Sequence, residues 1–156
     1  MKEYGELLRN DRVYSEKANL FSVKVRDFAE FLSNMQLNTN FGSLRMKVTY
    51  QDPCHLVHGQ GIRNEPREIL GKIPGIELVE MEDSEVCCGF GGTFSVKFQE
   101  ISTAMAEDKA TAIAKTNAKY LVANDSSCLM QIGGYLSRHR VPVKPLHLAD
   151  LLGDNL

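Results

Sequence analysis

The sequence predicts an α/β fold: a mostly parallel sheet of about four strands with flanking helices, preceded by an N-terminal helical arm. Two observations lead to this prediction. From Lys47 onward, short β-prone runs alternate with amphipathic stretches at helical spacing. That alternation is typical of parallel strands joined by right-handed crossovers. A chain of 156 residues is also long enough for one domain to bury a core.

Residues 1–43 are predicted to form the helical arm and a linker, and residues 44–156 a cysteine-rich α/β domain. In the arm, apolar residues recur at steps of four, three and four, which is the spacing of one helix face: Phe21, Val25, Phe28 and Leu32. The helical stretch is expected to end near Met35. Gln36–Ser43 is polar and contains two asparagines and a glycine, which predicts a linker.

Four short runs rich in β-forming residues are the predicted strands: Lys47–Tyr50, Ile76–Met81, Tyr120–Ala123 and Val143–Leu146. Proline cannot donate a backbone hydrogen bond to a neighbouring strand. Pro142 and Pro145 therefore place the last of these strands at an edge of the sheet.

Helices are predicted between and after these strands. One follows Asn64, which is a good cap, and has Pro66 in its first turn. The next covers Gln99–Thr116. Its apolar side is expected to consist of Ile101, Met105, Ala112 and Ile113. A third helix places Cys128 in or near its first turn, and a short one covers Leu148–Leu152.

All four cysteines of the chain follow predicted strands. Cys54 comes after the first strand, the adjacent Cys87 and Cys88 after the second, and Cys128 after the third. His147 follows the fourth. In open α/β sheets, the carboxyl ends of the strands form the edge where binding sites are built. We therefore expect the four thiols, which are far apart in the sequence, to meet at this edge.

Cys87 and Cys88 run directly into a glycine-rich turn that contains Gly89, Gly91 and Gly92. Neighbouring Cα atoms are about 3.8 Å apart across a trans peptide, while a relaxed disulfide needs at least about 4.4 Å. A bridge between the two would be strained, so another use of the thiols is predicted. The glycines would allow backbone N–H groups to turn toward a negative centre. Such a turn could also cradle a phosphate, but neither the full dinucleotide-binding motif nor a P-loop lysine–serine pair is present.

Four thiols from three places in the chain match the ligand count of a tetrahedral zinc ion and of an iron–sulfur cluster. Structural zinc sites usually draw on close Cys-x-x-Cys pairs, and this chain has none. Two other interpretations stay open. The cysteines could be buried small hydrophobes, or one of them could be a thiol of lowered pKa with redox chemistry of its own.

The net charge of −2 gives no electrostatic basis for binding nucleic acid, so no such partner is expected. No apolar run reaches the roughly 18 residues of a membrane span, and the first residues lack the apolar stretch of a signal peptide. The chain is therefore expected in the cytoplasm, where thiols stay reduced. Paired cysteines in that compartment are more often ligands or redox groups than structural bridges.

Four short motifs contain three of the cysteines or follow the last predicted strand: Asp52–Leu56 (DPCHL), Cys88–Phe94 (CGFGGTF), Cys128–Met130 (CLM) and His147–Leu152 (HLADLL). In these motifs the chain resembles the cysteine-rich (CCG) domain family. It is most similar to the C-terminal domain of the glycolate oxidase iron–sulfur subunit and to the lactate-utilisation iron–sulfur protein, and is related to the cysteine-rich subunit of heterodisulfide reductase. The glycolate oxidase subunit also carries a ferredoxin-like region and a first cysteine-rich repeat. The chain is therefore expected to correspond to its C-terminal part.

The resemblance implies an electron-transfer domain of a complex that oxidises a 2-hydroxy acid, glycolate or lactate. The cofactor would be an iron–sulfur cluster of the 4Fe–4S type, with zinc as the alternative in a structural or interaction module without redox activity. The implied cofactor-binding residues are Cys54, Cys87, Cys88 and Cys128, together with Gly89, Gly91 and Gly92. Electrons would arrive from a flavin-containing subunit and leave toward quinone or another membrane acceptor, at the inner face of the membrane. The domain would not itself oxidise the acid.

One position departs from the heterodisulfide reductase pattern, because Asp125 stands where that protein has a further cysteine. Asp125 is expected to cap a helix rather than to bind metal. His55 and His58 are expected to hydrogen-bond within a loop, with donation to a cluster sulfur as the alternative. His147 is expected either to act at the site or to orient the start of the last helix. The acidic turn Glu80–Glu85 is expected to be solvated or to dock a partner subunit.

Overall fold

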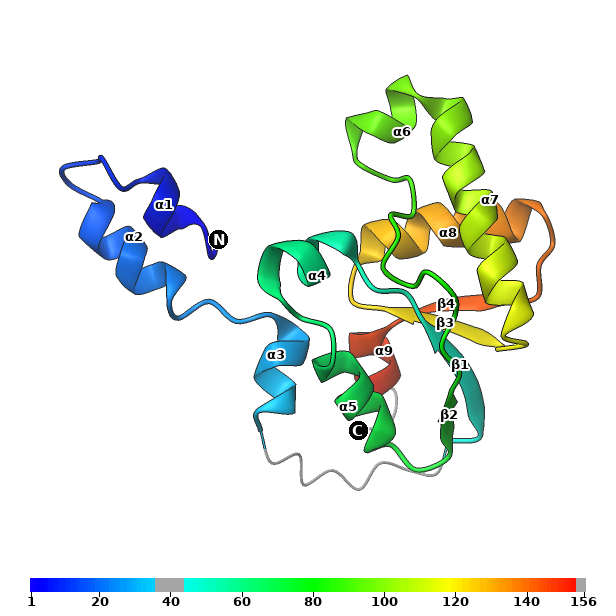
Figure 1. The fold of residues 1–156 in the computed structure, drawn as a ribbon. Coiled ribbons are helices and arrows are strands. Elements are labelled where there is room, and N and C mark those ends of the chain that lie inside the picture. The colour runs from blue at the N-terminus through cyan, green and yellow to red at the C-terminus, as the bar shows by residue number, and fades with distance from the viewer. Residues whose placement is uncertain (36–43, 154–156) are drawn as a thin grey trace.

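The computed structural model describes residues 1–35 and 44–153. Its centre is a four-stranded sheet in which every pair of neighbours is parallel, with strand order β2-β1-β3-β4. The strands are β1 (Met46–Tyr50), β2 (Ile76–Leu78), β3 (Tyr120–Ala123) and β4 (Lys144–His147). Figure 1 shows them side by side with helices packed around them. The predicted fold class is confirmed.

The boundaries of β1, β2 and β4 differ from the sequence prediction by one to three residues, most of all at the end of β2. β2 ends at Leu78 rather than at Met81, so the chain leaves the sheet early and begins the loop that carries the cysteine pair. The last bond to the sheet is donated by the Val79 N–H to the Val48 oxygen at 2.9 Å. β4 begins at Lys144, one residue later than predicted, and lies at an edge of the sheet as its prolines require.

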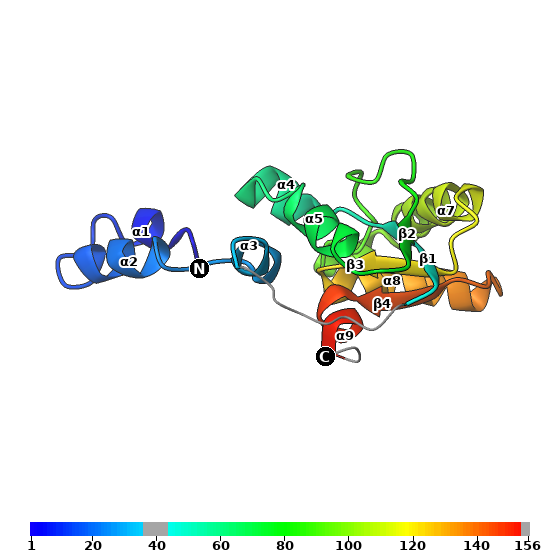
Figure 2. The same cartoon turned by 90° about the horizontal axis from the view of Figure 1, so that it is seen from below.

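Helices cover both faces of the sheet. One face is covered by α5 (Glu65–Gly71) and α9 (Leu148–Gly153), with α3 (Phe28–Ser33) packed on α5. The other face is covered by α7 (Gln99–Lys115) and α8 (Ser126–Arg138). In both Figure 1 and Figure 2, α7 lies on the opposite side of the strands from α5 and α9. Val122 of β3 packs into the first layer and Leu121 into the second, which follows from the alternation of side chains along a strand.

The predicted apolar side of α7 is partly right: Ile113 is buried and Ala112 packs against the core, but Ile101 does not face inward. The buried residues of this helix are Ser102, Ala106, Lys109, Ala110 and Ile113, while Ile101 is 57% exposed. The reason is the close approach of the loop that carries the cysteine pair. A Cβ atom at Gly89 would lie 2.6 Å from the Ser102 oxygen, so the loop packs directly on the backbone of α7 at Ser102 and buries that side of the helix.

Two short helices on the cysteine loops were not predicted from the sequence. They are α4 (Cys54–Gln60), which Pro53 precedes as its N-cap, and α6 (Thr93–Lys97). Neither is long enough to show a helical period. α5 begins after Asn64 with Pro66 in its first turn, as predicted, although the Asn64 side chain makes no capping hydrogen bond.

The N-terminal arm is helical but not continuous. α1 (Tyr4–Leu7) and α2 (Ser15–Ser22) pack against each other, and the rings of Tyr4 and Phe21 stack with centroids 5.8 Å apart. The predicted single face through Phe21, Val25, Phe28 and Leu32 is wrong, because the chain leaves the helix after Ser22. Asp27 then starts α3 by a capping box, in which its side chain accepts the Ala29 N–H at 2.8 Å.

The arm meets the α/β unit through α3. Ala29 is fully buried in the core beside β1, and Lys2 forms an ion pair with Glu30 at 2.5 Å. Figures 1 and 2 show α1 and α2 standing apart from the sheet. The predicted linker, Gln36–Ser43, lies outside the described residues. The division into an arm and a separate domain stays a prediction.

Candidate functional site

The strand order brings together the three loops that carry cysteines. Cys54 begins α4 directly after β1, Cys128 lies in the first turn of α8 after β3, and Cys87 and Cys88 lie between β2 and α6. β2, β1 and β3 are neighbours and run parallel. The three loops therefore leave the sheet at the same carboxyl edge, where α/β folds build their sites.

The four thiols form two pairs. Cys54 is hydrogen-bonded to Cys87, and Cys88 to Cys128. The two pairs also interact electrostatically: the charge of Cys88 raises the pKa of Cys54, and the charge of Cys54 raises the pKa of Cys128. All four are free, with Cys88 and Cys128 buried and the other two half-buried. Within residues 1–35 and 44–153, no three Cys, His, Asp or Glu side chains are grouped so as to hold a single metal ion.

The surroundings of the thiols favour negative charge on Cys88 and disfavour it on Cys54 and Cys128. The hydrogen bond from Cys128 lowers the pKa of Cys88 to about 6, against the opposing effect of burial, and the backbone N–H of Phe90 lowers it further. The same hydrogen bond, followed by burial, raises the pKa of Cys128. Burial, followed by the charge of Cys87, raises the pKa of Cys54. The Cys88–Cys128 pair thus holds one negative charge in the interior, shared through their hydrogen bond.

Gly89 is fixed in the turn that follows the cysteine pair. It has φ +86°, and its N–H donates to the Cys87 sulfur at 3.4 Å. Its carbonyl oxygen accepts the Ser102 hydroxyl at 2.8 Å, and the Gln131 side chain donates to that hydroxyl at 2.8 Å. The turn is therefore held by residues of both α7 and α8, and it points a backbone donor at a thiol.

Gly91 and Gly92 form the entry to α6. Both have positive φ angles, +49° and +58°. A Cβ atom at Gly91 would lie 2.8 Å from that of Phe94, whose N–H donates to the Gly91 oxygen at 3.2 Å. These two glycines shape the turn, and their contact with a cofactor stays a prediction.

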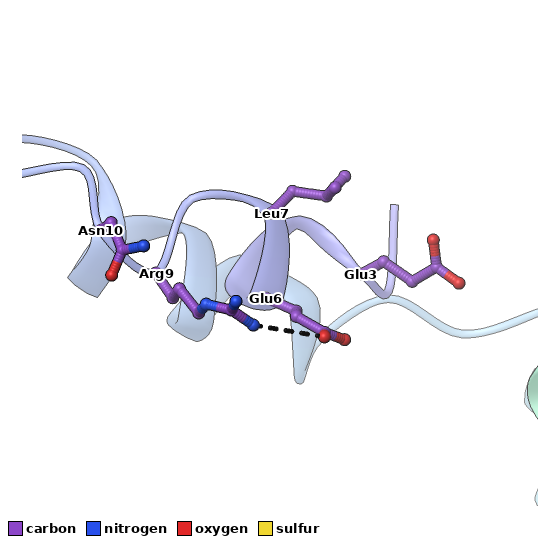
Figure 3. A pocket seen from close by; sticks show the side chains of 5 residues that line it. All are labelled: Glu3, Glu6, Leu7, Arg9 and Asn10. Atoms are coloured by element: carbon purple, nitrogen blue, oxygen red, sulfur yellow. Dashed lines mark hydrogen bonds and ion pairs between the residues drawn. The ribbon is translucent and has the colours of Figure 1, made fainter.

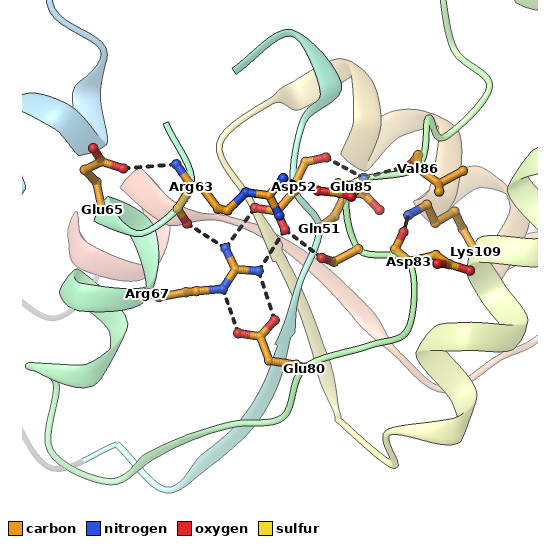
Figure 4. Close-up of polar contacts among 11 residues, drawn as sticks. Gln51, Asp52, Arg63, Glu65, Arg67, Glu80, Asp83, Glu85, Val86 and Lys109 are labelled. Atoms are coloured by element: carbon orange, nitrogen blue, oxygen red, sulfur yellow. Dashed lines mark hydrogen bonds and ion pairs between the residues drawn. The ribbon is translucent and has the colours of Figure 1, made fainter. Parts of the chain in front are cut away.

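An ion-pair network joins the loop of the first cysteine to the loop of the cysteine pair. Arg67 of α5 donates to both carboxylate oxygens of Asp52, at 2.8 and 2.7 Å, and to both of Glu80, at 2.7 and 2.9 Å. The Ser84 hydroxyl also donates to Asp52, at 2.7 Å. Figure 4 shows Arg67 between the two carboxylates. Because Asp52 lies just before the first cysteine and Ser84 just before the pair, the network fixes the spacing of the two loops.

Burial by itself would raise the pKa of Asp52. The hydrogen bonds from Arg67 and Ser84 outweigh it, so the pKa of this carboxyl lies below its usual range. The neighbouring Gln51 is also fully buried, and its side-chain N–H donates to the Asp52 carbonyl oxygen at 2.8 Å. The carboxylate is therefore charged, enclosed and fully committed to the network.

Several residues that hold this site were missed from the sequence, among them Gln51, Arg67 and Lys109. Lys109 is buried on α7 and donates to the Asp83 carbonyl oxygen. The sequence pattern could have revealed Lys109, because it shares a helix face with Ala106 and Ile113, where an apolar residue would be expected. Gln51 and Arg67 carry no such signal, because their partners lie far away in the sequence.

Asp125 caps α8, as predicted. Its side chain accepts the N–H groups of Ser127 at 2.7 Å and Cys128 at 3.1 Å. His55 Nδ1 lies 3.3 Å from the Asp125 carboxylate. His147 Nδ1 accepts the Ala149 N–H at 3.1 Å, which confirms its role in starting the last helix. His58 is exposed.

Two surface cavities differ in their relation to the thiols. One, of about 320 Å³, lies between α7 and the acidic loop and is lined by Cys87, Met105 and Lys109, among others. The other, shown in Figure 3, lies on α1 in the arm. It is bordered by Glu6 and by Arg9, which form an exposed ion pair at 3.5 Å. It contains no thiol, so only the first cavity belongs to the cysteine site.

None of the helices within residues 1–35 and 44–153 has both the length and the apolar character needed to cross a membrane.

Comparison with known proteins agrees with the geometry of the site. Lactate utilization protein A of Halalkalibacterium halodurans is 40% identical over 96% of this chain and 62% of that protein. The proteins of the same name from Lysinibacillus sphaericus and Bacillus subtilis are both 36% identical over 97% of this chain, and over 67% and 64% of their own lengths. The chain thus spans about two thirds of these relatives. Residues 48–133, which include all four cysteines, match the profile of the family described as the cysteine-rich domain, CCG. The chain belongs to this cysteine-rich domain family.

Proposed function

We propose that this chain is an electron-transfer domain that holds a 4Fe–4S cluster on Cys54, Cys87, Cys88 and Cys128. The observation that supports the proposal is that two pairs of free thiols, carried by three loops, lie at one edge of the sheet. Cysteine thiolates are the ligands of such clusters, and hydrogen bonds to sulfur stabilise their negative charge. The thiol of lowered pKa and the N–H donated to Cys87 fit this requirement.

A bound cluster would supply one-electron transfer. The residues of the chain would hold, orient and shield this cluster. Asp125 fixes the first turn of α8, so that Cys128 lies at the positive end of a helix dipole. Ser102 and Gln131 keep the turn of the cysteine pair in place. The burial of Cys88 and Cys128 limits access of water to that side of the site.

The relatives are named for lactate utilization, and this supports a place in a complex that oxidises a 2-hydroxy acid. Lactate is the substrate that those names favour, and glycolate is the alternative. Electrons would come from a flavin-containing subunit, which oxidises the acid, and would pass to quinone or another membrane acceptor. Glu82 and Asp83 are exposed in the acidic loop beside the cysteine pair, where a partner subunit could dock.

The test is metal and sulfide analysis of protein purified without oxygen. About four iron and four sulfide per chain are expected. Cys128→Ser is expected to lose most of this iron, while Ser126→Ala, at an exposed position two residues earlier, should retain it. One zinc ion without sulfide would replace the proposal by a zinc-stabilised interaction module. Full reactivity of one thiol with an alkylating agent, in protein that takes up neither metal, would favour a thiol redox enzyme instead.

A further inference from the structure

Lys109 is a buried cation beside the cysteine site. It is 3% exposed, and its Nζ donates a hydrogen bond to the Asp83 carbonyl oxygen. The same oxygen accepts the Val86 N–H at 3.0 Å and so closes the turn that leads into Cys87. Lys109 and Cys87 line the same cavity. Figure 4 shows the ammonium group of Lys109 pointing at this turn.

In the described part of the chain, Lys109 forms no ion pair with a carboxylate. Asp52 is occupied by Arg67 and Ser84. Asp83 accepts the hydrogen bond from Lys109 through its backbone oxygen, and the residue as a whole is exposed to solvent. A buried ammonium group that lacks a counter-charge strongly destabilises a fold. Asp83 and Asp52 favour the charged form of Lys109 without forming a contact ion pair with it, so a further buried negative group would stabilise it.

The cysteine site provides that negative charge. Burial lowers the pKa of Lys109, and Cys88 is the foremost of the groups that raise it again. The charges of Asp83 and Asp52, and after them that of Cys128, act in the same direction. Both cysteines are buried, as Lys109 is, so their electrostatic interaction with the ammonium group is weakly screened. A centre held by four thiolates would carry more negative charge than one thiolate and would pair with the lysine more strongly.

We propose that Lys109 is a positioning residue that balances the charge of the four-thiol site and favours one-electron reduction of the cluster held there. This inference rests on the proposed function. Reduction adds one electron, supplied by an electrode in the test below, and forms or breaks no bond. It makes the site more negative by one charge, and a buried cation stabilises the more negative state. The hydrogen bond to Asp83 keeps the cation at a fixed place.

The test is a mediated redox titration of the full chain after anaerobic purification, followed by visible absorption and electron paramagnetic resonance. Lys109→Met removes the charge and keeps the length of the side chain, while Lys109→Arg keeps the charge. Lys115→Met is the matched control. Lys115 lies on the same helix and lines the same cavity, but it is 64% exposed and pairs with Glu82 at 2.9 Å.

Lys109→Met is expected to lower the equilibrium constant for reduction at least tenfold, which is about 59 mV for one electron. Lys109→Arg and Lys115→Met should stay within threefold of the wild type. The inference is overturned if Lys109→Met also stays within threefold, or if Lys109→Arg shifts as far as Lys109→Met does.

Some variants could fail to retain iron, and this outcome also tests the inference. Loss of the cluster from Lys109→Met but not from Lys109→Arg supports a requirement for positive charge. Loss from both variants, with circular dichroism showing a folded chain, overturns the inference, because the charge alone does not suffice. A wild-type chain that binds no iron and sulfide refutes the proposed function itself, and this is measured before any variant is compared.

Discussion

Replacing Arg67 with methionine is expected to destabilise the protein by about 3 kcal/mol at neutral pH. The Asp52 side chain is 1% exposed, and its main partner is the Arg67 guanidinium, which is 21% exposed. Removing one partner of a buried ion pair costs about 3–5 kcal/mol, because the other charge stays buried without compensation. The partial exposure of Arg67 places the value at the lower end. With a urea dependence of about 2 kcal/mol per molar, the unfolding midpoint should fall by about 1.5 M.

The pH dependence of this loss gives a sharper test than its size. In the wild type the pKa of Asp52 is lowered, so its ionised form contributes stability above the unfolded-state pKa of about 3.9. That contribution is lost as pH falls through the folded-state pKa. In the variant only burial and the Ser84 hydrogen bond remain, so the carboxyl is expected to take up its proton more easily. The gap between the two proteins should therefore be full at pH 7 and shrink as pH falls toward about 4.

Urea unfolding followed by circular dichroism at a series of pH values measures both quantities. The double variant Asp52→Asn, Arg67→Met is the control, because it removes the buried charge together with its partner. It is expected to recover part of the stability that Arg67→Met loses. The reasoning is refuted if Arg67→Met unfolds at the wild-type urea concentration, or if its loss of stability is the same at pH 4 as at pH 7.

Three further predictions concern the loops around the thiols. Gly89→Ala should destabilise the fold by about 1–3 kcal/mol in thermal melts, because the new Cβ would lie 2.6 Å from the Ser102 oxygen and the backbone φ is +86°. Gly134 lies in a helix with open space around it, so Gly134→Ala should be neutral or slightly stabilising in the same measurement. Asp125→Asn should keep the helix cap and the bound iron, while Asp125→Ala should lose about 1 kcal/mol of stability. Loss of iron from a folded asparagine variant would show that Asp125 is a ligand instead. Iron uptake should weaken as pH falls from 9 to 6, because the raised pKa of Cys128 means that a proton must leave before metal binds, and equal uptake across that range would contradict this.

Several features of the fold follow from local sequence alone. The alternation of strands and helices predicts the parallel sheet, since the period of apolar residues reports the local backbone conformation. β3 lies where the sequence predicts it, at Tyr120–Ala123, and the prolines near residue 145 mark the edge strand. Asp125 is recognisable as a helix cap because it needs only the next three residues to act. The order of strands then explains why loops distant in sequence meet at one edge.

Other features depend on which element packs against which. The buried face of α7 is set by the loop of Gly89, which touches Ser102, and a helical period in the sequence cannot show such a neighbour. The arm breaks between α2 and α3, where the Asp27 capping box starts a new helix, and the spacing of Phe21 and Phe28 does not reveal this.

The cysteine motif, the family and the number of thiols are thus contained in the sequence, since they are properties of residue type and spacing. The pairing of Cys54 with Cys87 and of Cys88 with Cys128 is not, nor is the placing of Arg67 and Lys109 around them. The binding role of the thiols stays a prediction. Charges and thiols act through distance and burial, and residues far apart in the chain acquire both only when the sheet has brought their loops together.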